Sequence, residues 1–170
     1  GSSTVYTGWR GISSATNWWP PSYDQSRQLV FVPSVEAASL YVLSKPVKFK
    51  PMKPYGGGYV SAYAANQPNT AFVKAIDAET GEIRWEAVLG RGSDDFVWTV
   101  SGVLSTKGGV VFAGYSDQVR AFDADDGKEL WKVRVGARVR GAPMSYEIEG
   151  KQYVAIMAGY SLFVFALPDH

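Results

Sequence analysis

Two similar stretches 46 residues apart are the feature that most limits what this chain can fold into. Residues 75–85 read A-I-D-A-E-T-G-E-I-R-W, and residues 121–131 read A-F-D-A-D-D-G-K-E-L-W. When the two are aligned, an Ala, an Asp, a second Ala, a Gly and the final Trp coincide. A repeat with a period of about 40–50 residues is typical of the blades of a β-propeller.

Each copy of the repeat is predicted to form a β-hairpin. Its turn begins with an Asp, whose carboxylate can accept backbone N–H bonds, and ends with a Gly, which tolerates a left-handed conformation. The hairpins close on Trp85 and Trp131, and an indole offers a large flat surface for packing with one N–H that needs an acceptor. A coincidental pair of hairpins in a β-sandwich is the alternative, and the shared spacing and shared Trp disfavour it.

Short apolar runs separated by turn residues predict about eleven strands in three antiparallel units. The units span about 16–90, about 101–136 and about 141–168. The first is interrupted by a Pro- and Gly-containing excursion at 34–70, which we interpret mainly as a long surface loop. Several strands are apolar at consecutive positions, so both of their faces need cover, as a blade has between two others. The predicted fold class is therefore all-β, a partial β-propeller of about three four-stranded antiparallel blades.

Three blades do not close a ring, because a propeller typically has four to eight. An end blade with a bare apolar face and an unpaired edge favours aggregation. We therefore expect either the remaining blades of a longer propeller or other copies of this chain to cover the open faces.

Composition excludes several functional classes. The chain has no Cys, and its one His is the last residue, His170, so thiolate chemistry, a His-based relay and a zinc site are not expected. The net charge of +1 indicates neither a nucleic-acid footprint nor a membrane-surface patch. No apolar run approaches the ~20 residues of a membrane-spanning helix.

Two groups of charged residues are candidate ligand sites. We interpret Asp94 and Asp95 as a solvated loop pair, because a calcium site needs several converging oxygens and no others can be identified nearby. Arg138 and Arg140 could face an anionic ligand, but we interpret them as exposed loop residues.

Three further stretches carry a family resemblance. They are T-N-W-W-P-P-S-Y-D at 16–24, S-G-V-L-S-T-K-G-G-V-V-F-A-G at 101–114 and G-A-P-M-S-Y-E-I-E-G-K-Q-Y-V-A at 141–155. Together with the A-x-D-x-x-x-G-x-x-x-W repeats, which resemble tryptophan-docking motifs, they resemble the C-terminal part of quinoprotein alcohol dehydrogenases. These are eight-bladed propellers that bind pyrroloquinoline quinone (PQQ). The docking motif also occurs in non-enzymatic propellers, whereas the N-W-x-P-P-S-Y segment is more specific.

The resemblance implies particular cofactor contacts. Asn17 matches an Asn that hydrogen-bonds the quinone from the edge of the ring; its alternative role is to shape the turn before Trp18. Trp98 is the nearest match to a Trp that lines the cofactor site, with a docking role as its alternative. Trp18 is included in the same site, but packing inside the propeller is the role we favour for it. The resemblance also implies PQQ, calcium, a small alcohol substrate and the bacterial periplasm for the parent enzyme.

The family's remaining functional residues have no counterpart in this chain. Its catalytic Asp, the Glu and Asn ligands of calcium and the Trp beneath the cofactor belong to earlier blades, so we assign no catalytic residue and no metal ligand here. We therefore expect a C-terminal propeller fragment that is inactive alone. The alternative function is a non-catalytic PQQ-repeat propeller that binds protein partners, as in outer-membrane assembly.

Overall fold

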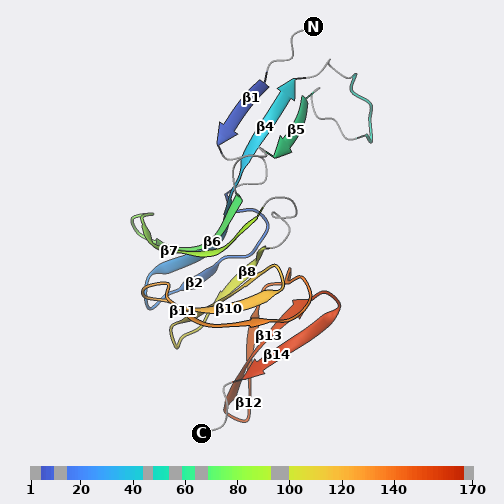
Figure 1. Cartoon of the computed structure of the whole chain (residues 1–170). Coiled ribbons are helices and arrows are strands. Elements are labelled where there is room, and N and C mark those ends of the chain that lie inside the picture. The colour runs from blue at the N-terminus through green and yellow to red at the C-terminus, as the bar shows by residue number, and fades with distance from the viewer. Residues whose placement is uncertain are drawn as a thin grey trace.

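The described part of the computed structural model contains strands and turns but no α-helix (Figure 1). In particular, it contains no helix of the length and apolarity that crossing a membrane requires. The described residues are 5–9, 15–43, 48–53, 59–63, 69–92 and 100–166.

Fourteen strands of this part form four antiparallel sheets. The strands are β1 (Val5–Trp9), β2 (Ser22–Asp24), β3 (Leu29–Glu36), β4 (Ala38–Leu43), β5 (Tyr59–Tyr63), β6 (Asn69–Asp77), β7 (Ile83–Gly92), β8 (Val100–Ser105), β9 (Val110–Tyr115), β10 (Gln118–Asp123), β11 (Glu129–Arg134), β12 (Met144–Ile148), β13 (Lys151–Ala158) and β14 (Ser161–Ala166). The sheet orders are β2-β3-β6-β7, β11-β10-β9-β8, β12-β13-β14 and β1-β4-β5.

The first three of these sheets follow one another along the chain and lie next to each other in space (Figure 1). Strand β8 of the second sheet contacts both β2 and β3 of the first. The predicted all-β partial propeller is confirmed, including the four consecutive strands of the second unit and the three strands of the third. The fourth sheet, β1-β4-β5, stands apart from the other three in Figure 1.

The excursion at 34–70 differs from the predicted surface loop. Strand β3 continues to Glu36 and pairs with β6, which begins at Asn69. The first and last residues of the excursion therefore belong to the first sheet. Between them, β4 and β5 pair with each other, and β4 pairs with β1. Their sequences, A-S-L-Y-V-L and Y-V-S-A-Y, are rich in residues that favour strands, and the surrounding prolines and glycines concealed this.

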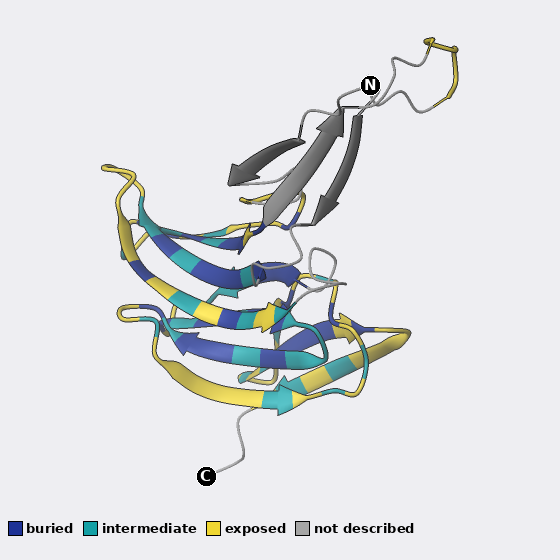
Figure 2. Ribbon diagram, turned by 45° about the horizontal axis from the view of Figure 1, so that its top comes forward, coloured by how far each residue is buried: buried dark blue, intermediate teal, exposed yellow. Residues whose placement is uncertain are grey.

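Two apolar clusters hold the three stacked sheets together. The larger joins the first two sheets and includes Phe31, Val73 and Val111, while the smaller joins the second and third and includes Val119 and Ile156. The second sheet therefore buries apolar side chains on both faces, as its consecutive apolar residues predict. Figure 2 shows this burial in the middle of the stack and more exposed residues along β11 and in the β12–β14 sheet.

Candidate functional site

An indole on an edge strand of the first sheet contacts the hairpin turn of the second sheet. The Nε1–H of Trp85, on edge strand β7, donates to the carbonyl oxygen of Ala124 at 2.9 Å. The ring lies directly over Gly127, where an added Cβ would be 2.6 Å from ring atom Cε3. Phe31 packs against the same ring, with centroids 5.6 Å apart. The repeated Trp and the repeated Gly thus meet in one contact between successive sheets.

The repeated Asp orders the turn, as predicted. Oδ1 of Asp77 accepts the backbone N–H groups of Glu79 and Thr80, each at 3.0 Å. These hydrogen bonds hold the pKa of Asp77 below its ordinary value, and the bond from Thr80 has the larger effect. In the second copy, Asp123 accepts the N–H of Asp125 at 2.8 Å.

The second repeat Trp is placed differently. Trp131 is 38% exposed and meets Phe165 of the third sheet edge-on, with ring centroids 5.1 Å apart. The third unit contains no further copy of the repeat, so Trp131 does not have the buried arrangement of Trp85.

The three stretches that carry the family resemblance converge at Gly102. The carbonyl oxygen of Pro20 accepts the N–H of Val103 at 3.1 Å. A Cβ on Gly102 would lie 2.6 Å from Cγ of Pro20 and 2.8 Å from Cβ of Ala142. One residue from each of the stretches 16–24, 101–114 and 141–155 is therefore in close contact at a point where only Gly fits.

The predicted cofactor residues lie next to this junction on the chain. Asn17 is exposed, and its Oδ1 accepts the N–H of Trp18 at 2.9 Å, the turn-shaping role that was its alternative. Trp18 is 55% exposed, whereas Trp19 is buried in the larger cluster. The packing role considered for Trp18 thus belongs to Trp19, which the sequence reasoning missed because adjacent indoles outside a strand have no periodicity to separate them.

Trp19 is also unusual in its hydrogen bonding. Its Nε1–H is buried and has no hydrogen-bond partner in the described part of the chain, a property shared by Oγ of Ser34. Buried polar atoms are rarely left unpaired in folded proteins. The junction thus combines an amide, an exposed indole and a buried unpaired N–H within three consecutive residues.

The other candidate residues separate into two groups. Trp98, Asp94 and Asp95 lie outside the described residues. Arg138 and Arg140 are exposed, in agreement with their interpretation as loop residues. The described residues hold no group of three His, Cys, Asp or Glu side chains that could bind a metal ion.

A charged network also joins the first two sheets. The guanidinium of Arg27 donates to Asp24 at 3.0 Å and to Asp125 at 2.8 Å. Both carboxylates raise the pKa of Arg27, and Asp125 has the larger effect. Burial raises the pKa of Asp24, but hydrogen bonds from Ser26 and Arg27 outweigh it and leave a net lowering. The adjoining cavity of about 410 Å³ is lined by this hydrogen-bonded carboxylate and by the exposed Lys107.

Antiparallel sheets of up to four strands, stacked in chain order and joined through an edge-strand indole, define a β-propeller. The chain belongs to the PQQ-dependent dehydrogenase family: residues 2–154 match the family model "Glucose/ethanol/alcohol dehydrogenase, beta-propeller domain".

Individual relatives agree with this assignment. The chain is 36% identical over 146 residues to a 1-butanol dehydrogenase (quinone) of Thauera butanivorans and 32% identical over 145 residues to a quinoprotein alcohol dehydrogenase of Pseudomonas putida. Each match covers 85% of this chain and 22% of the relative. The solved quinohemoprotein alcohol dehydrogenase of Comamonas testosteroni superposes with a TM-score of 0.74 at 25% identity, covering 94% of this chain and 24% of that one. The chain thus spans about a fifth of the length of the curated relatives it matches.

Proposed function

We propose that this chain is the C-terminal part of a PQQ- and calcium-dependent alcohol dehydrogenase of the bacterial periplasm. In this proposal it supplies part of the propeller scaffold and one edge of the quinone pocket, and it has no dehydrogenase activity alone. The observation that carries the proposal is the junction at Gly102, where the three family-like stretches meet beside the exposed Asn17 and Trp18.

The side chains beside the junction suit an edge contact with the cofactor. PQQ carries carboxylates and carbonyls, and an amide can both donate to and accept from such groups. The Nδ2 of Asn17 would donate to the quinone while its Oδ1 remains on the N–H of Trp18. Trp18 and Trp98 would provide apolar walls that exclude water from that edge.

The chemistry itself would come from the bound quinone, which takes up the electrons of the alcohol, while protein groups bind and orient it. In the proposed parent, the catalytic Asp and the calcium ligands would come from other blades. The same blades, or further copies of this chain, would cover the exposed faces of the first and third sheets.

Equilibrium titration of the purified chain with PQQ in the presence of calcium tests the proposal. Followed by quinone absorbance, the titration should show no stoichiometric complex, and addition of 1-butanol should not reduce an artificial electron acceptor. Tight binding of one PQQ per chain, or turnover with the alcohol, would contradict the view that this part of the pocket is insufficient alone.

A further inference from the structure

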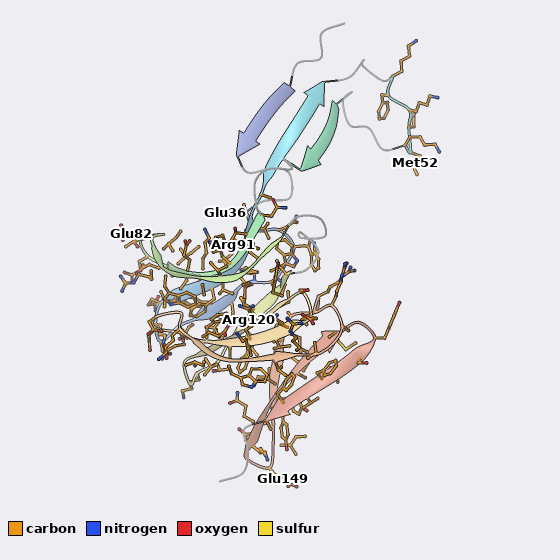
Figure 3. All side chains as sticks on the ribbon, viewed as in Figure 1. Glu36, Met52, Glu82, Arg91, Arg120 and Glu149 are labelled. Carbon is orange, nitrogen blue, oxygen red and sulfur yellow. The ribbon has the colours of Figure 1, made fainter. Side chains whose placement is uncertain are left out.

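A short basic and apolar segment lies away from the stacked sheets (Figure 3). Residues 48–53 read K-F-K-P-M-K, and all six are exposed. Phe49 is 66% exposed and Met52 is 100% exposed. Figure 3 shows Met52 well away from the propeller sheets, on a loop beside the β1-β4-β5 sheet. We refer to residues 48–53 as the tip.

The backbone of the tip holds Met52 at the apex of a turn. The N–H of Lys53 donates to the carbonyl oxygen of Lys50 at 3.3 Å, Pro51 occupies the second position, and Met52 has φ of 61°. This is the pattern of a type II turn, whose third position favours Gly. A Met there adopts a conformation that costs free energy, and no burial within the described chain offsets it. The exposed side chain at this position therefore points to a role outside the fold.

The charge of the tip is hidden by the average over the whole chain. Three of its six residues are Lys, and no Asp or Glu occurs anywhere from residue 37 to residue 76. The net charge of +1, which indicates no membrane-surface patch, results from acidic residues elsewhere in the sequence. Local charge, and not net charge, is what a nearby surface experiences, because screening limits the interaction to about 10 Å at ordinary ionic strength.

We propose that the tip binds an anionic lipid surface, a role independent of the proposed quinone function. Lys48, Lys50 and Lys53 contact the lipid phosphates, while Phe49 and Met52 enter the headgroup region. Basic residues combined with exposed apolar side chains are the combination that such surfaces attract. A protein partner is disfavoured by size, because a specific protein interface uses roughly 20–30 residues a side and the tip has six. A lipid surface needs no matching shape.

Vesicle flotation of the full 170-residue chain tests the proposal. The chain should float with phosphatidylcholine vesicles that contain anionic phosphatidylglycerol, should not float with pure phosphatidylcholine, and should be released by high salt. The triple variant K48Q/K50Q/K53Q should lose binding by about fivefold per lysine, roughly a hundredfold in total. The matched control K107Q/K128Q/K132Q removes the same charge from the second unit and should bind like the unaltered chain.

The apolar contribution is tested separately. Met52→Gly keeps the turn, because Gly favours the positive φ, but removes the side chain, and Phe49→Ser removes the aromatic ring; each should weaken vesicle binding several-fold. Absence of binding to the anionic vesicles, or equal loss in the two lysine variants, would overturn the proposal. The proposal would also be overturned if the chain bound soluble polyglutamate as well as it binds the anionic vesicles and if Met52→Gly and Phe49→Ser had no effect. That combination would indicate an acidic partner. Loss of binding in M157S/L162S would place the contact on the third sheet and would also overturn it.

Discussion

Two glycines with the same backbone conformation have different surroundings in this chain. Gly127 has φ of 74° and supports the ring of Trp85, whereas Gly136 has φ of 72° and nothing within 4 Å of an added Cβ. The sequence repeat predicted the turn role of Gly127 and the packing role of Trp85. It did not predict that the two residues contact each other across successive sheets, because that contact depends on how the blades stack.

The two glycines allow the inter-sheet contact to be separated from backbone strain. Gly136→Ala should lower the free energy of unfolding by about 1 kcal/mol, because Ala resists the left-handed conformation. Gly127→Ala carries the same strain and also forces Cβ against the ring of Trp85, so it should cost about 3 kcal/mol. Urea unfolding followed by circular dichroism measures both values. Equal losses in the two variants would show that the Trp85 contact contributes nothing to stability.

Asp24 should give the chain a specific acid sensitivity. Its folded-state pKa is lowered, so its stabilisation is present above the unfolded pKa of about 3.9 and is lost as pH falls through the folded value. Asp24→Asn should therefore destabilise the chain by about 1–2 kcal/mol near pH 7, and by progressively less below about pH 4. Urea unfolding at a series of pH values gives the comparison.

The exposed carboxylate of Glu147 serves as the control for this series. Glu147→Gln should change the free energy of unfolding only slightly. A pH-independent difference for Asp24→Asn would contradict the assignment of the network between Asp24, Arg27 and Asp125.

At the scale of the elements, the strands of the second and third units were predictable because turn residues stand at both ends of each apolar run. Strands β4 and β5 were not, since β4 pairs with the distant β1 and the neighbouring Pro and Gly residues indicated a loop. At the candidate site, the N-W segment was recognised, but the opposite environments of Trp18 and Trp19 were not. Burial of neighbouring residues outside a strand depends on tertiary contacts that no local pattern encodes.

Strand β14 is the edge of the third sheet and carries an exposed apolar face. Leu162, Val164, Met144 and Met157 are all exposed on this sheet, and such faces promote association. The isolated chain should therefore increase in apparent mass with concentration in light scattering, and L162K/V164K should remain monomeric over the same range.

The control for this variant adds the same charge to the same sheet at exposed polar positions. Q152K/S161K should associate nearly as the unaltered chain does. A chain that stays monomeric at every concentration would show that these faces do not mediate association in isolation.

At the scale of the whole molecule, the 46-residue period was enough to predict stacked antiparallel units. The meeting of the three family-like stretches at Gly102 was not predictable, because they are distant in sequence and are brought together only by the stacking of three sheets. This junction is also where the structural and functional arguments coincide. Under the proposed function, this sector of the propeller would act in catalysis only when the other blades are supplied.

The most direct measurement is quinone binding by a chimera in which this chain replaces the matching segment of the 1-butanol dehydrogenase of Thauera butanivorans. Titration with PQQ and calcium should give one equivalent bound, and Asn17→Ala in the chimera should raise the Kd about tenfold, the loss of one hydrogen bond. Lys132→Gln, at an exposed position on β11 outside the three stretches that meet at Gly102, should leave the Kd unchanged. A folded chimera that binds no PQQ, or one whose affinity is the same with Asn17→Ala, would contradict the proposal that this chain forms one edge of the quinone pocket.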